Sequence, residues 1–530
     1  MKKAQIMMLA AALVITMSGC AAEQKTVPET TSDAADTASY ATEIPTSTET
    51  TAPAASITSS LEKVSSATLA EAPETVPESS YSAVSTAEMT ETSAVDTTAE
   101  PTTTTAAAEN DTTTTPESTP ASTTASSATE PTTADKTEAP ETIAEIPEYD
   151  NSAEYPATVL KSGDALNGGT YTATGKDESV LEASGNVHAT VIGAVLKKVS
   201  GDASSADDSS FKGVNAGVRV YGSAEVTLTD CAVEADAKNA TGVFAYDKGV
   251  IYISDSMVTV TGGGAGGIQV AGGGTLFGTN LTVTSASKAA IRSDRGGGTM
   301  VIDGGTYTSE GSSGCPVIYS TADITVKNAV GVSKQSRAVI IEGKNSVTLE
   351  NCTLTGNDRS TKAGSIRANV LLYQSASGDA KEGTSVFSMT GGKMISESGA
   401  MFYCTNTSSI VNLNSAELVL SDSGELLTVS AGRWGKDGRN GGSCVLNAED
   451  QTLAGSITVD SISSLELNLT NSTYKGVIMN EGKVSVNLGS DSKWELTGDS
   501  YITSFSGDAS NIISNGYTLY VNGRALSGTN

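Results

Sequence analysis

A short residue that favours tight turns recurs through the last two-thirds of this chain, and seven of the ten intervals measure 23 to 25 residues. The markers are Gly168, Gly193, Asp230, Asp255, Asn280, Gly304, Asn328, Asn351, Gly391, Ser415 and Asn471. Glycine, asparagine and aspartate tolerate left-handed backbone, which ends a strand in a tight turn. A fixed period of this length is typical of a solenoid, in which each repeat contacts its neighbours.

Apolar residues alternate around each marker, as Val226 and Leu228 do before Asp230, and another follows three residues after it, as Val233 does. Alternation of this kind indicates strands. A second alternating pair lies twelve and ten residues before the marker, for example Val218 and Val220. Each coil therefore holds two recognisable strands, with room for a third.

This pattern predicts an all-β fold, a single-stranded parallel β-helix solenoid over residues 151–530 with roughly thirteen coils. Coils of two strands and a turn resemble those of the right-handed pectin-lyase-like helices, so we expect a right-handed solenoid. The polar markers are predicted to stack as a structural turn ladder. Its members are Asp230, Asp255, Asn280, Asn328, Asn351 and Asn471.

The first nineteen residues have the features of a signal peptide. Lys2 and Lys3 precede an apolar run from Ile6 to Met17, which is too short to span a bilayer. The sequence Ser18-Gly19-Cys20 resembles a bacterial lipobox, in spite of Met17 where leucine is usual. The resemblance implies lipidation of Cys20 and anchoring to a membrane, and the alternative is an ordinary signal peptide.

Residues 20–150 differ in composition from the rest of the chain. Eleven of the 13 prolines lie between Pro28 and Pro147, and residues 21–150 carry 24 acidic side chains against three lysines. The segment contains few large apolar residues, and their burial could not offset the entropy cost of ordering the chain. We therefore expect a disordered Thr/Ser/Pro/Glu-rich stalk. The strongly acidic balance argues against a nucleic-acid partner, which needs a basic surface. We therefore expect an extracytoplasmic, membrane-anchored protein.

Five cysteines follow Cys20, and two of them occupy the same position in the repeat, one residue after a marker. Cys231 and Cys352 lie five coils apart, about 24 Å, which is too far for a disulfide. We interpret all five as small buried apolar residues that do not pair within the chain. The distance between Cys404 and Cys444 stays open, because an insert separates them.

Enzymes of the pectin-lyase-like class need clustered carboxylates and a basic residue. The one Asp-Asp pair, Asp207 and Asp208, falls in the insert 201–213, and the coils adjacent to Asp294 offer no aligned carboxylate. His188, the single histidine, is expected to be an exposed strand residue. We therefore predict no catalytic residue, no metal site and no cofactor, with a polysaccharide lyase or hydrolase as the alternative.

Two further inserts, 357–367 and 432–442, are better candidates for function, because long loops on a rigid scaffold often bind ligands. The second carries Arg433, Trp434, Lys436 and Arg439, a set suited to stacking on a sugar and holding its carboxylate. The opposing interpretation, which we favour, is that Trp434 packs against the solenoid. Asp358, in the first of these inserts, is expected to lie on the surface.

The C-terminal segments from Trp494 to Phe505 and from Ile513 to Gly523 resemble the closing coils of bacterial adhesin-like β-helix surface proteins. The resemblance implies non-catalytic binding of a glycan, such as a host or cell-surface glycan, or of another surface, and a structural envelope component is a further alternative. Convergence of two carboxylates with an arginine or lysine outside one strand face would instead favour an enzyme.

Overall fold

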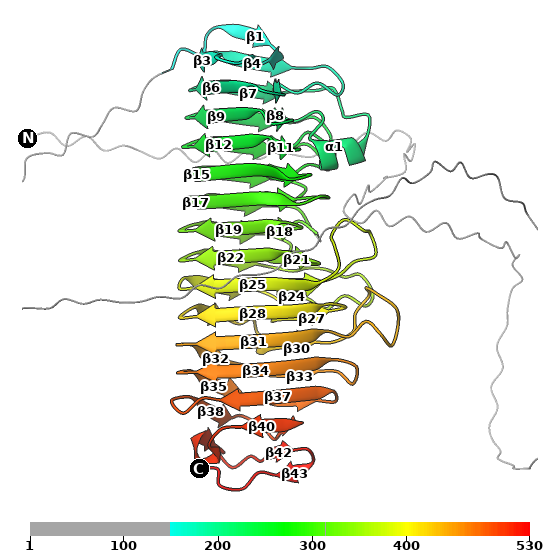
Figure 1. Ribbon diagram of the computed structural model, residues 1–530, viewed down its shortest axis with the longest axis vertical. Helices are drawn as coiled ribbons and strands as arrows, with labels where there is room; N and C mark the ends of the chain where they lie inside the picture. The colour runs from blue at the N-terminus through cyan, green and yellow to red at the C-terminus, as the bar shows by residue number, and fades with distance from the viewer. Residues whose placement is uncertain (1–148, 313) are drawn as a thin grey trace, which may run out of the picture. The chain divides into compact units, whose positions relative to one another are not determined.

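A computed structural model describes residues 149–312 and 314–530, and these residues form the predicted all-β parallel β-helix (Figure 1). The predicted signal peptide, the lipidation site Cys20 and the stalk up to residue 148 lie outside the described residues. The coils stack through parallel pairing, and a 13-stranded sheet supplies about one strand to each of them. Each coil contributes to three faces of the helix rather than to the two that were recognisable in the sequence.

The first face consists of the strands that precede each marker. Its strands are β3 (Ala165–Asn167), β6 (His188–Ile192), β9 (Glu225–Thr229), β12 (Val250–Ser254), β15 (Gly274–Ser285), β17 (Gly298–Ser309), β19 (Asp323–Lys327), β22 (Ser346–Glu350), β25 (Thr384–Thr390), β28 (Ser408–Asn414), β31 (Ser443–Glu449), β34 (Ser464–Thr470), β37 (Lys483–Leu488) and β40 (Ser504–Ser506). Their burial alternates residue by residue, as the apolar pattern predicts.

The second face consists of the strands that follow each marker. It contains β1 (Glu154–Pro156), β4 (Thr170–Ala173), β7 (Val195–Lys198), β10 (Ala232–Ala235), β13 (Met257–Val260), β20 (Val330–Ser333), β23 (Thr353–Gly356), β26 (Lys393–Ser396) and β29 (Glu417–Val419), then β32 (Thr452–Ala454), β35 (Thr473–Gly476), β38 (Lys493–Leu496) and β41 (Ile512–Ile513). The twelve-residue strands β15 and β17 run past the marker into this face, which joins the two faces into one sheet.

The third face is the 13-stranded sheet. Its strands are β2 (Thr158–Val159), β5 (Leu181–Ser184), β8 (Val218–Tyr221), β11 (Val243–Tyr246), β14 (Ile268–Ala271), β16 (Ile291–Ser293), β18 (Ile318–Ser320), β21 (Val339–Glu342), β24 (Ala368–Tyr373), β27 (Ala400–Thr405), β30 (Glu425–Val429), β33 (Ser456–Val459) and β36 (Ile478–Asn480). Beyond it, β39 (Ser500–Ile502), β42 (Leu519–Val521) and β43 (Arg524–Ala525) end the stack, and the last two pair antiparallel.

The markers take up left-handed backbone at the corner between the first and second faces. Asp230, Asp255, Asn280, Asn328 and Asn351 all have φ between 51° and 53°. Side chains also bond along the axis, since Asn280 Nδ2 donates to Asp255 Oδ1 at 2.9 Å. Asp450 lies at the same corner, with φ of 50°. It was not recognised as a marker because it lies 35 residues after Ser415 and 21 before Asn471, outside the regular period.

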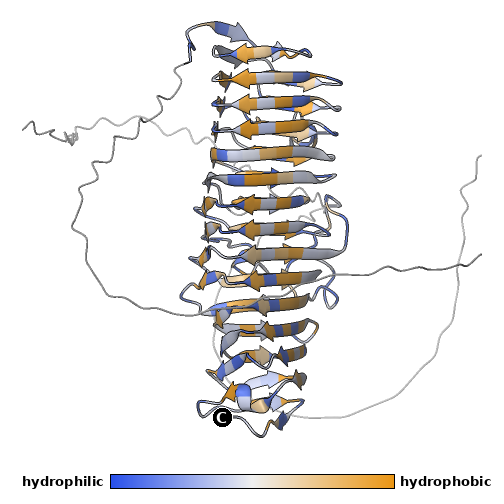
Figure 2. Cartoon of the chain, turned by 60° about the vertical axis from the view of Figure 1, so that its left-hand side comes forward, coloured by the Kyte–Doolittle hydropathy of each residue, from blue (hydrophilic) through white to orange (hydrophobic). Residues whose placement is uncertain are grey.

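One continuous apolar core fills the helix from Leu160 to Leu519. Figure 2 shows hydrophobic residues interspersed with hydrophilic ones along the stacked strands. Apolar side chains from all three faces point into the core, so each inward column stacks like on like at the spacing of strands. Near the C-terminal end the buried Trp494 stacks on Tyr474 at 5.6 Å between ring centroids and donates to Gly476 O. Phe505, partly buried, packs against the same core.

Inserts leave the regular coils mainly next to the third face. The first contains the helix α1 (Ala206–Lys212), which begins at the capping residue Ser205 and ends at Gly213 with φ of 69°. The extra residues between Asn351 and Gly391 divide into two loops, 357–367 and 374–383, which flank β24. A fourth loop, 430–442, joins β30 to β31, and η1 (Ala509–Asn511) is a short 3-10 turn near the end.

Candidate functional site

The outer side of the third face is covered where the inserts lie, which sets it apart from the other faces. Strands β5 and β8 alternate between buried and partly exposed residues, whereas β21, β24 and β27 are buried along their whole length. Outside these strands a second, small apolar cluster forms. Its buried members are Ile340, Ala368, Leu371, Tyr373, Ala400 and Tyr403.

A groove of about 270 Å³ lies on this covered face. Its walls come from α1, from third-face strands and from the loops 374–383 and 430–442, and they include Ser210, Lys288, Asp294, Glu342, Ser375 and Trp434. A smaller recess of about 60 Å³, lined by Arg337, Ser360, Ile366 and Tyr403, shares part of its wall. Arg292, Tyr319, Tyr373, Arg433 and Trp434 line both cavities.

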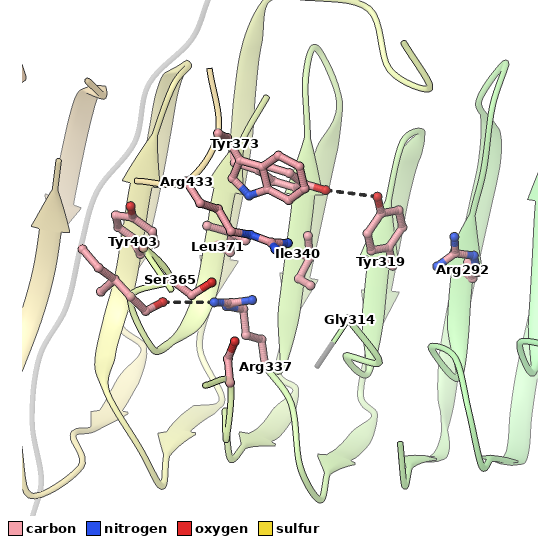
Figure 3. A pocket seen from close by; sticks show the side chains of 14 residues that line it. Arg292, Gly314, Tyr319, Arg337, Ile340, Ser365, Leu371, Tyr373, Tyr403 and Arg433 are labelled. Atoms are coloured by element: carbon pink, nitrogen blue, oxygen red, sulfur yellow. Dashed lines mark hydrogen bonds between the residues drawn. The ribbon is translucent and has the colours of Figure 1, made fainter. Parts of the chain in front are cut away.

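Glu342 organises the floor of the groove. Its Oε2 accepts hydrogen bonds from the hydroxyls of Tyr319 at 2.6 Å and Tyr373 at 2.7 Å, and its Oε1 accepts from Ser375 and Ser377. Figure 3 shows the two tyrosines pointing toward one another from their strands. Burial raises the pKa of Tyr319 well above its ordinary value, with the Tyr373 and Glu342 groups adding to the shift. The network therefore keeps the Tyr319 phenol protonated and holds both rings in place.

Arg292 and Asp294 form the next part of the floor. Arg292 donates through Nε and Nη2 to Asp294 Oδ2, at 3.1 and 2.8 Å, and its guanidinium lies 4.5 Å from the centroid of the Tyr319 ring. Both side chains are nearly buried. The coils directly adjacent to this pair carry no aligned carboxylate, so the sequence did not predict a site here. Glu342 supplies the second carboxylate two coils further, so two carboxylates and an arginine do converge outside one strand face.

Lys288 is a nearly buried cation in the wall of the groove. Its Nζ donates to Ser210 Oγ on α1 at 2.6 Å, and no described carboxylate forms an ion pair with it. The residue is 9% exposed. Burial, with Arg292 nearby, lowers the pKa of Lys288 to about 8, so the ammonium is mostly charged at neutral pH. A buried charge that forms no direct ion pair favours binding of an anion.

Bridges between inserts hold the walls of the groove. Arg295 pairs with Asp379 on the loop 374–383 at 2.5 Å and lies 4.2 Å over the Phe211 ring of α1. Gly364 lies against Arg433, since a Cβ at Gly364 would stand 3.3 Å from the Arg433 Cβ. The loops that are separate in sequence therefore contact one another over the third face.

Asp358 is buried, which contradicts its expected place on the surface. Its Oδ2 pairs with Arg337 Nη2 at 2.8 Å, and its oxygens accept from the backbone N–H groups of Ser360 and Ala368. Burial lowers the pKa of Arg337 despite this partner. The ion pair anchors the loop 357–367 to the segment before β21, and the bond from Ala368 ties it to β24, so a residue in an insert is part of the packed structure.

Of the four predicted ligand-binding residues, two line the cavities and two do not. Arg433 and Trp434 line both cavities, and the indole lies 5.2 Å from Tyr373 and 4.2 Å from the Arg433 guanidinium. Trp434 is partly buried against the outer apolar cluster, as the packing interpretation predicts. Lys436 and Arg439 are exposed on the outer turn of the same loop and line neither cavity.

Four residues of the groove were not predicted from the sequence: Lys288, Tyr319, Glu342 and Tyr373. A usable signal was present in the strands that carry Glu342 and Tyr373. The segments 338–342 and 368–373 are almost uninterrupted apolar runs, unlike the alternating strands of the other faces. Such runs indicate a strand covered on both sides, and a charged or phenolic residue at the end of such a run points to a built site.

Other observations limit what the described part of the chain contains. Within residues 149–312 and 314–530, no group of three or more His, Cys, Asp and Glu side chains is placed to hold a metal ion. Helices long and apolar enough to cross a membrane are likewise not found among these residues. His188 lies exposed beside Glu225 on the first face, away from the groove. Comparisons with protein-family models, with curated proteins and with solved structures found nothing similar to this chain.

Proposed function

We propose that this chain is a lipid-anchored surface protein whose β-helix binds an acidic glycan without transforming it, in an adhesin-like role. The signal-peptide features, the lipobox resemblance at Cys20 and the acidic segment 20–150 support display on a stalk outside the cytoplasm. The pectin-lyase-like, right-handed form of the helix belongs to the same proposal.

The observation that carries the proposal is the buried Lys288 ammonium inside the groove, whose hydrogen-bond partner is the Ser210 hydroxyl and not a carboxylate. Hydroxyls, carboxylates and aromatic rings surround it, and these groups suit the hydroxyls and the ring faces of a sugar. A carboxylate or sulfate on that sugar would balance the charge of Lys288. An oligosaccharide that carries acidic groups therefore fits the groove better than a neutral one.

A glycan array tests this proposal with the soluble chain from residue 21 onward. We expect binding of carboxylated or sulfated glycans and little binding of their neutral counterparts. Lys288→Met should weaken capture at least tenfold, because it removes the cation that faces the ligand. Lys436→Met is the matched control, since it removes an exposed lysine outside both cavities. Equal binding by the two variants, or no binding to any glycan, would count against the proposal and favour a structural envelope role.

The anchor is tested separately. Cys20→Ala should release the protein from membranes or block its maturation, because the lipidated cysteine is the attachment point. A Cys20→Ala variant that stays membrane-bound with unchanged processing would remove the anchor from the proposal and leave the groove unaffected.

A polysaccharide hydrolase or lyase is the second candidate, and the convergence of Asp294, Glu342 and Arg292 favours it. Asp294 directly follows β16 and Glu342 ends β21, so the two carboxylates lie two coils apart, about 10 Å along the axis. That spacing is close to the roughly 6.5–9.5 Å of inverting glycosidases. Against it, Glu342 already accepts four hydroxyl hydrogen bonds and Asp294 is held by Arg292.

The second candidate predicts that acidic polysaccharide is cleaved by the wild-type protein and not by Asp294→Asn or Glu342→Gln. Size-exclusion chromatography of the polysaccharide after incubation distinguishes the two candidates. An unchanged size distribution with retained binding supports the non-catalytic proposal.

A further inference from the structure

Two buried thiols meet inside the helix at the base of the loop 430–442. Cys404, on β27 of the third face, and Cys444, on β31 of the first face, have their Sγ atoms 3.6 Å apart. Both side chains are buried and both cysteines are free in this structure. Cys231 and Cys352, by contrast, hydrogen-bond to backbone carbonyls in separate coils.

The backbone brings these two cysteines together independently of their side-chain rotamers. Cys444 lies in register with Ser409, which follows Cys404 by five residues at the corner between the third and first faces. Gly442 approaches so closely that a Cβ there would stand 2.5 Å from the Cys404 carbonyl oxygen. Ser430 N also donates to that same carbonyl oxygen at 3.2 Å. Both ends of the loop 430–442 therefore contact Cys404.

We propose that Cys404 and Cys444 form a disulfide when the chain folds in the presence of an exchangeable disulfide. A disulfide needs the sulfurs about 2.05 Å apart, so the gap closes by about 1.5 Å through rotation of the two side chains. In the reaction the two thiols lose two electrons and two protons, and the oxidant disulfide is reduced to two thiols. The bond links the first and third faces across the core.

The bond would fix the base of the loop that carries Arg433 and Trp434. It closes a loop that contains residues 405–443, including the whole connection from β30 to β31. The unfolded chain loses freedom when such a loop is closed, so the oxidised form is expected to melt at a higher temperature than the reduced form. The inference depends on the fold alone and not on the proposed glycan.

Burial and the contact between the sulfurs also determine the stage of folding at which the disulfide forms. The thiol–thiol hydrogen bond from Cys404 and burial raise the pKa of Cys444 well above its ordinary value. Because the thiolate is the reactive species, the finished core exchanges slowly. The two thiols are therefore expected to be oxidised while the coils assemble.

The test is refolding of the full chain carrying Cys20→Ser, in a buffer of oxidised and reduced glutathione, followed by thiol counting after denaturation without reductant. Five cysteines remain in this variant. We expect three free thiols, a mass about 2 Da below the reduced chain, and one cross-linked peptide pair that contains Cys404 and Cys444.

Two single variants make the test specific. Added to the Cys20→Ser chain, Cys404→Ala removes one partner and should retain all four remaining thiols, whereas the matched control Cys352→Ala in the same chain should retain two of four. Five free thiols in the refolded Cys20→Ser chain, or a cross-link between other cysteines, would overturn the proposal. Mixed disulfides with glutathione are identified by their added mass and would also overturn it.

Discussion

At the scale of single residues, the repeat identifies the turn positions but not the partners of polar side chains in the inserts. Asn351 stands where its spacing predicts, with φ of 53°, because local backbone geometry selects the residue type. Asp358 was expected to be exposed because it lies outside the period. Its burial depends on Arg337, which is 21 residues away in the sequence, and no local pattern links the two.

The burial of Asp358 makes its substitution more costly to stability than substitution of the turn residue Asn351. Asp358→Leu should cost about 3–5 kcal/mol, because it leaves the Arg337 guanidinium buried without its counter-ion. Asn351→Leu should cost about 1–2 kcal/mol, because leucine at this positive φ is strained and, unlike asparagine, cannot form a local hydrogen bond that offsets the strain. Midpoints of denaturant unfolding compare the two variants. A larger loss for Asn351→Leu would mean that the Arg337–Asp358 pair contributes little.

Lys288 should make stability depend on pH. Its pKa is about 8 in the folded chain and about 10.5 in the unfolded chain, so the unfolded chain binds more protons between these values. The free energy of unfolding therefore rises with pH across this window, by about 3 kcal/mol at most. The penalty is present below pH 8 and is lost as pH rises toward 10.5.

The measurement is the difference in unfolding free energy between wild type and Lys288→Met from pH 7 to pH 10.5. We expect Lys288→Met to be the more stable protein at pH 7 and the difference to shrink with rising pH. Lys436→Met, which changes an exposed lysine, should show no such trend. A difference that stays constant with pH would contradict the assigned state of Lys288.

At the scale of elements, the strands flanking each marker were predictable because their alternation depends on neighbours two residues apart. The third-face strands were harder to recognise, since several are three or four residues long and the inserts vary their distance from the marker. The groove could not be predicted from the sequence. The groove depends on the path that α1 and the loops 357–367, 374–383 and 430–442 take over the third face. That path is set by packing against the outer side of β21, β24 and β27, which the sequence does not reveal.

The loop 430–442 should behave as a packed element and not as a solvated one. Trp434→Ala removes an indole that contacts Tyr373 and the outer apolar cluster, so it should lower the free energy of unfolding by about 1–2 kcal/mol. Lys436→Ala on the same loop should stay within about 0.5 kcal/mol of wild type. Thermal melting followed by circular dichroism compares them, and equal melting temperatures would show that the loop does not stabilise the helix.

At the scale of the whole molecule, one core runs unbroken past every insert, from Leu160 to Leu519. Limited proteolysis should therefore leave a single resistant fragment that begins near residue 149, while we expect the acidic segment before it to be digested. Each coil is stabilised by the coils on either side of it, so a cut within an insert should not release a coil. Two separately stable fragments divided between residues 357 and 383 would contradict the single core.

The period of the markers, with their residue types, was enough to predict the all-β parallel β-helix, and the inserts that interrupt the period are the parts that build a site. The central claim is that these inserts create a binding groove for an acidic glycan. The most direct test is a crystal structure of the protein soaked with the acidic oligosaccharide that binds best in the array. We predict electron density for the sugar in the groove between α1 and the loop 430–442, with an acidic group within hydrogen-bonding distance of Lys288 Nζ. Density for the ligand on the first or second face, with the groove empty, would contradict the claim.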